Sequence, residues 1–189
     1  MSYLPLLKHL ADEADRIATH YFRSNRLKVS RKENTTPVSV ADLEIEKVIR
    51  DYVQEHHPEL GILGEEYEAV PSTTGSRLII DPIDGTKNFT CGIPYFCVAV
   101  ALELQGEVIA AVTFAPALQE WFCAEKGQGM WHNDKKVVWN KDYWKKRSAL
   151  LIERHSSVSR SQVYKKLKET GFSGSFRYYG AAALDLGYI

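Results

Sequence analysis

Apolar residues recur near the start of the chain with the 3.6-residue period of an amphipathic helix. One such stripe covers Leu6 to Phe22, and a second runs from Ser39 to about His56. Pro37 ends the polar stretch between them, because a proline holds the preceding residue extended. The pattern therefore predicts two helices, with Asp42 in the first turn of the second.

Short apolar runs separated by turn residues occupy the middle of the chain. Gly61 to Gly64 and Arg77 to Ile80 each have the length of a strand, and the second run stops abruptly at Asp81. Three further runs alternate with turn residues, as in an antiparallel meander: Phe96 to Leu104, Val108 to Phe114 and Trp121 to Glu125. We expect a sheet that is mixed or mainly antiparallel.

The last part of the chain gives shorter signals. They predict a strand, a helix, a second strand and a terminal helix-like run, at Leu150 to Ile152, Ser159 to Thr170, Gly174 to Tyr179 and Ala181 to Ile189. The terminal run is apolar and is followed by neither a cap nor a polar tail. We expect an α+β fold that occupies residues 1–189 as a single domain and is incomplete at its C-terminal end.

Composition narrows the class of protein. A chain of 189 residues with 44% hydrophobic side chains is long enough for one compact core. Its 24 basic and 24 acidic residues balance and form no long block, which favours a small ligand over nucleic acid. The three cysteines lack C-x-x-C spacing, and no apolar stretch approaches the roughly 20 residues that span a bilayer. We expect a cytoplasmic protein that binds no membrane.

The first candidate site follows the predicted strand at Arg77 to Ile80. Asp81 and Asp84 lie three residues apart, and Pro82 between them stiffens the turn. The two carboxylates and the carbonyl of Ile83 are thus placed to converge on one point. Oxygen ligands of this kind suit magnesium. The same residues are also typical of a helix cap or an Asx-turn, so the two interpretations stay open at this point.

Two residues after this pair add a possible anion site. Gly85 lets the backbone approach a ligand closely, and the amides of Gly85 and Thr86 would form an anion cradle if they open a helix. A metal ion and a phosphate group would then meet at the same turn.

A second acidic pair strengthens the metal interpretation. Glu65 and Glu66 also follow a short apolar run, so three or four carboxylates would gather at one end of the sheet. Like charges raise one another's pKa unless cations neutralise them. A pair of divalent ions is the economical explanation. A calcium loop of the EF-hand type is not favoured, because the sequence lacks its twelve-residue ligand frame.

Four motifs lie in order along the chain. They are Lys32-x-x-x-x-Pro37-Val38-Ser39-x-Ala41-Asp42, Gly64-Glu65-Glu66, the segment Asp81 to Phe89, and Gly180-Ala181-Ala182-Ala183-Leu184-Asp185. In this order they resemble the successive motifs of the inositol monophosphatase family. The resemblance covers the whole chain and implies a layered α/β/α/β/α sandwich. Three segments are most similar to the histidinol-phosphatase branch: Thr36 to Ser39, Thr86 to Phe89 and Gly92 to Pro94.

The resemblance implies a metal-dependent phosphatase site. Glu65, Asp81 and the Ile83 carbonyl would hold the first Mg²⁺. Asp81 and Asp84 would hold the second, so that Asp81 bridges the two ions. Two or three Mg²⁺ ions are implied for each active site, and Mn²⁺ would substitute for them.

The resemblance also implies catalytic and phosphate-binding residues. The hydroxyl of Thr86, linked to Asp42, would place the attacking water in line with phosphorus. Phosphate or substrate would be bound by the glycine-rich segments, namely Gly85, Thr86, Gly180, Ala181 and Ala182. No covalent phosphoenzyme is needed for this chemistry.

One departure from the family pattern concerns the second ion. Family members carry a further metal-ligand aspartate, in a Trp-Asp pair beyond the motif at Gly180 to Leu184, and this sequence stops before it. We therefore expect the chain to be the N-terminal two-thirds or so of the phosphatase domain. On its own, it is expected to bind the second ion weakly and to turn over slowly.

The implied function is magnesium-dependent hydrolysis of a small phosphate monoester. Histidinol phosphate is the first expected substrate, inositol monophosphate the second and a nucleotide 3′-phosphate the third. The alternative from another class is a catalytically silent fragment of the same fold that binds metal or phosphate. We also expect a homodimer. The four tryptophans most simply fill the faces of the sheet, and one at a sheet edge is the alternative for a dimer contact.

Overall fold

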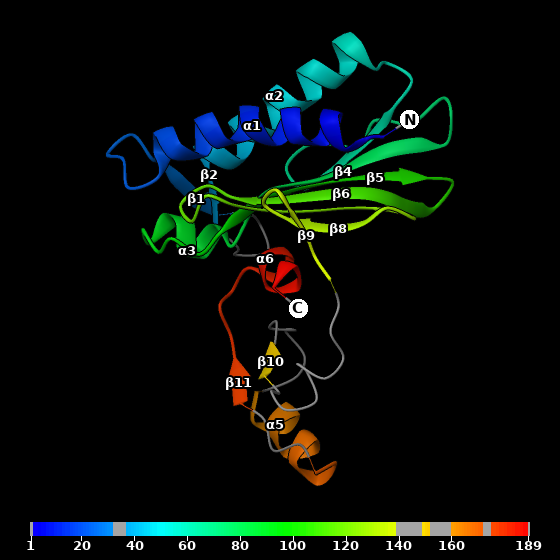
Figure 1. Ribbon diagram of the computed structural model, residues 1–189. Coiled ribbons are helices and arrows are strands. Elements are labelled where there is room, and N and C mark those ends of the chain that lie inside the picture. Colours follow the sequence, from blue (N-terminus) through cyan, green and yellow to red (C-terminus); the bar gives the residue numbers. More distant parts are fainter. Residues whose placement is uncertain (1, 32–36, 139–148, 152–159, 172–174, 189) are drawn as a thin grey trace.

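The computed structural model describes residues 2–31, 37–138, 149–151, 160–171 and 175–188, and the statements below concern those residues. Two helices, α1 (Leu4–Tyr21) and α2 (Val40–His56), lie together over one face of the main sheet (Figure 1). Both helices were predicted. The first begins two residues before its predicted start because Pro5, in its first turn, removes only an N–H that has no partner within the helix.

The main sheet has seven strands in the order β3-β4-β5-β6-β7-β8-β9. Their bounds are β3 (Gly61–Gly64), β4 (Ser76–Asp84), β5 (Cys97–Leu104), β6 (Glu107–Ala115), β7 (Glu120–Glu125), β8 (Gly129–His132) and β9 (Lys135–Lys136). Strands β3 and β4 are parallel, and every other neighbouring pair is antiparallel. The prediction of a mixed, mainly antiparallel sheet is therefore confirmed.

Strand β4 corrects one predicted boundary. The prediction that this strand stops at Asp81 is wrong, because β4 continues to Asp84. Strand β5 keeps pairing with it, placing Ala99 opposite Asp81 and Cys97 opposite Asp84. The register shifts between the two aspartates, where Pro82 has no N–H to give to the ladder. The two carboxylates thus flank an irregular stretch of a strand instead of lying in the loop after it.

Short elements lie on the opposite face of the sheet from α1 and α2. They are α3 (Thr86–Thr90) and α6 (Ala182–Gly187), and beyond α6 lie the parallel pair β10 (Ala149–Leu151) and β11 (Ser175–Arg177) and then α5 (Arg160–Glu169) (Figure 1). Strands β1 (Val29–Arg31) and β2 (Pro37–Ser39) form a separate antiparallel ribbon. The sequence of layers is the α/β/α/β/α order expected for this α+β fold.

The ends of several predicted elements lie outside the described residues. This applies to Ile152, Ser159, Gly174 and Ile189, and also to Lys32 and Thr36 of the first motif. Of the predicted terminal run, α6 accounts for Ala182 to Gly187. None of the described helices is both long enough and apolar enough to cross a lipid bilayer.

The main core lies between the two long helices and the sheet. Helix α1 buries Leu7, Leu10 and Ala14, and α2 buries Ile45 and Ile49, all against residues of the central strands. A smaller apolar cluster on the other face joins α6 to the sheet through Cys97, Ala115, Phe122, Ala181 and Leu184. The long helices therefore fix the sheet, and α6 is fixed to the sheet near the two aspartates of β4.

A truncation in this core tests the packing. Leu10 is fully buried, whereas Leu43 on α2 is 36% exposed. Leu10→Ala is expected to lower the free energy of unfolding by about 2–5 kcal/mol, because it removes buried methyl groups and leaves a cavity. The matched change Leu43→Ala is expected to cost under about 1 kcal/mol. Urea unfolding of both variants measures the difference, and equal losses would contradict the assigned packing of α1.

Candidate active site

The parallel pairing of β3 and β4 brings two acidic residues together. Gly64 is paired with Ile80 in the register of these strands, so Glu65, which directly follows β3, lies next to Asp81 within β4. Residues at the same level of two paired strands lie close together regardless of their separation in sequence. This part of the predicted site therefore follows directly from strand pairing.

Asp81 is a buried carboxyl group with other carboxyl groups around it. Its Oδ1 is buried and has no hydrogen-bond partner within the described part of the chain. Burial and, after it, the negative charges of Asp84, Glu65 and Asp42 together raise the pKa of Asp81 to about 8. A buried carboxylate oxygen without a donor is costly. A cation at this position would remove the cost.

Asp84 lies beside Asp81 but is directed toward α6. Its Oδ2 accepts a hydrogen bond from the amide of Ala183 at 2.6 Å and lies 3.6 Å from the Cys97 thiol, which donates to it. Burial raises the pKa of Asp84, and the amides of Ala183 and Ala182 act in the opposite direction. Of the residues predicted to bind phosphate, Ala182 thus has its amide turned to Asp84, together with the neighbouring amide of Ala183, which was not predicted.

Asp42 and Thr86 meet next to this group, although they are far apart in sequence. Asp42 is buried, and its Oδ2 accepts hydrogen bonds from the amide and hydroxyl of Ser39 at 2.8 and 2.5 Å. The hydroxyl of Thr86 lies 3.2 Å from Asp42 Oδ1 and 2.9 Å from the Ile83 carbonyl oxygen. Burial raises the pKa of Asp42, against the hydrogen bonds from Ser39. Asp42 therefore caps α2 and contacts Thr86 at the same time.

Gly85 allows the chain after β4 to turn directly into α3. Its φ of 88° lies in the left-handed region, which favours glycine. A Cβ at this position would come within 3.1 Å of the Gly180 carbonyl oxygen and of the Ala181 side chain. Asn88 on α3 also holds the segment at Gly180 close to Gly85. Its side-chain amide nitrogen donates to the carbonyl oxygens of Tyr95 and Tyr179, each at 2.7 Å. The predicted substrate-binding residues of both segments are therefore adjacent.

The predicted metal ligands fit a hard cation in chemistry but are not all turned toward one point. No group of three or more His, Cys, Asp or Glu side chains converges on an ion position among the residues that the structure describes. Asp84 faces α6, and the Ile83 carbonyl accepts from Thr86. The unpartnered oxygen of Asp81 and the surrounding negative charge nevertheless favour a divalent ion with oxygen ligands. The assignment of the ligand set stays a prediction.

Three residues that support this site were not predicted from the sequence. Glu46 and Arg50 on α2 hold the segment that carries Glu65, and Asn88 holds the segment at Gly180. The signal for the first pair was available, because two opposite charges four residues apart interrupt the apolar face of the predicted helix. Asn88 offered no such signal, since its partners are backbone carbonyls distant in sequence.

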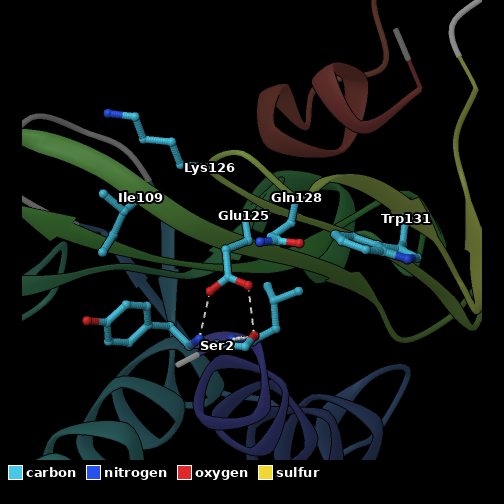
Figure 2. A pocket seen from close by; sticks show the side chains of 8 residues that line it. Ser2, Ile109, Glu125, Lys126, Gln128 and Trp131 are labelled. Carbon is cyan, nitrogen blue, oxygen red and sulfur yellow. Dashed lines mark hydrogen bonds between the residues drawn. The ribbon is translucent and has the colours of Figure 1, made fainter.

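Two hollows in the described part of the chain differ in their position relative to the candidate site. One of about 390 Å³ lies between the sheet and α6 and is mostly apolar, with Asp81 at its edge. Another of about 600 Å³ lies between the start of α1 and strands β6 to β8 (Figure 2). There Glu125 accepts hydrogen bonds from the Ser2 hydroxyl and the Tyr3 amide, each at 2.8 Å. The second hollow contains none of the predicted site residues, so the first is the one connected with the candidate site.

Comparison with known proteins decides the family. The model of the inositol monophosphatase family matches residues 3–189. This chain belongs to the inositol monophosphatase family. The resemblance inferred from the four motifs is thereby confirmed.

Individual family members carry different names. The chain is 38% identical to an inositol-1-monophosphatase of Rhizobium meliloti over 92% of its own length and 66% of the relative. It is 40% identical to a histidinol-phosphatase of Chlorobaculum parvum over 71% of its length and 52% of the relative. The chain thus spans about half to two thirds of the length of these relatives.

Solved structures of the family have the same fold. The extragenic suppressor protein suhB of Bartonella henselae matches with a TM-score of 0.88 and 31% identity, over 98% of this chain and 73% of that one. The IMPase of Thermotoga maritima matches with a TM-score of 0.84 and 26% identity, over 100% and 72% of the two chains. The α+β architecture expected from the sequence is therefore confirmed.

The raised pKa of Asp81 predicts how the stability of the metal-free protein depends on pH. Between about pH 4 and pH 8 the unfolded chain has lost the Asp81 proton while the folded protein keeps it, so stability falls as pH rises through this window. Asp81→Asn has no carboxyl group at this position and does not lose stability in this way. We therefore expect the unfolding temperature of Asp81→Asn, minus that of the parent protein, to increase from pH 4 to pH 8 when both are measured with a chelator.

Added Mg²⁺ provides the control for this measurement. A bound cation favours the ionised carboxyl, so Mg²⁺ should reduce the pH slope of the parent protein and leave the asparagine variant unchanged. A difference between the two proteins that is constant with pH would contradict the burial and charge environment assigned to Asp81.

Proposed function

We propose that the protein formed with this chain hydrolyses small phosphate monoesters with the help of Mg²⁺. The observation that carries the proposal is the contact between Asp42 and Thr86 next to the buried, unpartnered oxygen of Asp81. A hydroxyl held by a carboxylate orients a water molecule, and an unpartnered carboxylate oxygen favours a cation. Hydrolysis of a phosphate ester needs both at one place.

The proposed metal ligands are Glu65, Asp81, Asp84 and the carbonyl oxygen of Ile83. Bound Mg²⁺ would lower the pKa of a water molecule that it binds and would stabilise the negative charge on the leaving oxygen. Asp81 lies between the other acidic residues and is the proposed bridge between two ions. Mn²⁺ has similar oxygen preferences and is proposed to substitute.

The proposed role of Thr86 follows from what its hydroxyl contacts. One hydroxyl carries one proton, which Thr86 directs toward Asp42 or the Ile83 carbonyl. The oxygen lone pairs of Thr86 are therefore free to accept a hydrogen bond from the attacking water and so to orient it. Asp42 in turn is held by Ser39, so the orientation of the hydroxyl is set by the start of α2.

Phosphate is proposed to bind where the two glycine-containing segments meet. Gly85 and Thr86 open α3, and Gly180 to Ala182 lead into α6 directly beside them. Short side chains at these positions leave the backbone amides accessible to phosphate oxygens. The amides of α6 now engage Asp84, so phosphate binding there would require Asp84 to turn away from α6.

Histidinol phosphate is the proposed substrate, with inositol monophosphate as the second candidate. The motif variants at Thr86 to Phe89 and Gly92 to Pro94 support histidinol phosphate. Sequence identity does not separate the two candidates, because the inositol-1-monophosphatase and the histidinol-phosphatase described above are 38% and 40% identical to the chain. The competing proposal is a silent metal- or phosphate-binding protein of the same fold. Turnover by the complete protein that contains this chain distinguishes the two.

Replacing Thr86 tests the chemistry. Thr86→Ala in the complete protein is expected to lower kcat about 10²-fold with a smaller effect on KM, because the hydroxyl acts on the attacking water. Thr86→Ser keeps the hydroxyl and should retain most activity. The matched control is Thr90→Ala on the same helix, since Thr90 is half-buried and its hydroxyl donates to the Lys87 carbonyl at 3.1 Å. Normal kcat in Thr86→Ala would refute the role of Thr86.

A panel of phosphate esters tests the substrate. The complete protein is expected to hydrolyse histidinol phosphate with a kcat/KM at least about tenfold above that for inositol monophosphate, equivalent to about 1.4 kcal/mol. A nucleotide 3′-phosphate should be the poorest of the three. A higher kcat/KM for inositol monophosphate would overturn the substrate proposal while leaving the phosphatase proposal intact.

A further inference from the structure

Helix α2 carries three charged or acidic residues on its inner face. Asp42, Glu46 and Arg50 are spaced four residues apart, which places them above one another on one side of a helix. All three are buried, and Glu46 has no exposed surface at all. Asp42 contacts Thr86 of the candidate site, but Glu46 and Arg50 contact a different segment.

Glu46 accepts hydrogen bonds from three consecutive backbone amides. Its Oε2 accepts from the amides of Glu65 and Glu66 at 3.0 and 2.7 Å, and its Oε1 accepts from the amide of Tyr67 at 3.2 Å. These amides belong to the turn that follows β3. The position of the Glu65 backbone is thus fixed by a carboxylate on another element.

Arg50 completes this network from one turn farther along α2. Its Nε donates to Glu46 Oε1 at 2.8 Å, and its terminal nitrogens donate to the carbonyl oxygens of Glu68 and Tyr67 at 2.9 and 3.1 Å. The two side chains therefore bind both the amides and the carbonyls of one short segment. A charge-assisted network of this kind is much stiffer than a loop packed only by side chains.

Gly64 shows how closely the carboxylate lies against the turn. A Cβ built at Gly64 would fall 1.9 Å from Glu46 Oε1 and 2.3 Å from Glu46 Cδ. The glycine has no unusual φ that would otherwise require it. Its lack of a side chain is therefore needed for the approach of Glu46.

We propose that Glu46 is a positioning residue that holds the carboxylate of Glu65 at the metal site. The proposal rests on the proposed function, in which Glu65 is a ligand. Burial of an ion pair is a poor way to gain stability, because an apolar pair of similar size is often as stable or more stable. The Glu46–Arg50 pair instead provides what an apolar pair cannot, namely hydrogen bonds to every polar backbone group of the turn that it contacts. Residues that orient a metal ligand in this way typically contribute 10- to 100-fold in metal affinity.

The test uses two variants that disturb the same contact from opposite sides. Glu46→Gln replaces one carboxylate oxygen with an amide NH2 group, which cannot accept a hydrogen bond from the backbone N–H groups that it faces. Gly64→Ala keeps every charged group and displaces Glu46 by the added methyl. Each is compared with Glu44→Gln, a change on the same helix at a carboxylate that accepts from the Tyr21 hydroxyl at the surface.

Two readouts on the complete protein that contains this chain separate positioning from stability. Calorimetric titration with Mn²⁺ should show affinity about 10- to 100-fold weaker in Glu46→Gln and Gly64→Ala and unchanged in Glu44→Gln. Amide hydrogen exchange without metal should be faster at residues 65–67 in the same two variants. If Glu46→Gln does not fold, Gly64→Ala alone decides the question.

The outcomes distinguish failure of this proposal from failure of the proposed function. Folded variants that bind Mn²⁺ as tightly as the parent, with a lower unfolding temperature only, would overturn the positioning role and leave the metal site in place. A complete parent protein that binds no Mn²⁺ would overturn both. Weaker binding in the two variants, together with loss of amide protection, would establish the role of Glu46.

Discussion

The structure depends on the placement of several carboxyl groups at one end of the sheet, where burial and their mutual repulsion act on Asp81. Parallel pairing of β3 and β4 sets Glu65 next to Asp81, and the shifted register of β4 adds Asp84. Repulsion and burial raise the pKa of Asp81 to about 8. Each nearby element provides either a hydrogen-bond donor to one of these groups or the rigidity that keeps them together.

Donors for the acidic residues come from the backbone more than from basic side chains. Asp42 accepts from the amide of Ser39 and Asp84 from the amide of Ala183, whereas Glu46 is paired with Arg50. Backbone amides partly satisfy a carboxylate without cancelling its charge. The edge therefore keeps an excess of negative charge, which is the property expected of a site for divalent cations.

Much of this arrangement was predictable from sequence because it depends on local patterns. The two long helices, the antiparallel meander and the first-turn position of Asp42 follow from periodicity and capping residues. The continuation of β4 past Asp81 was not predictable, because it depends on pairing with Ala99 and Cys97.

The orientation of the side chains in the site could not be predicted from sequence patterns either. The turning of Asp84 toward α6 depends on amides almost a hundred residues away, for which local periodicity carries no information. The buried partners Glu46 and Arg50 were visible as charges on an apolar helix face, but their contact with the turn after β3 requires the tertiary fold. Sequence patterns thus identified the residues of the site better than their orientation.

The four-residue spacing on α2 also limits how the gene for this chain can change. Asp42 and Glu46 reach two different segments from one helix face, and insertion or deletion of one residue between them would rotate one relative to the other by about 100° and shift it by about 1.5 Å. Substitutions on the outer face, at Leu43 or Lys47, leave that relation intact. We expect natural variants to change the outer face of α2 freely and to preserve the number of residues between Asp42 and Arg50.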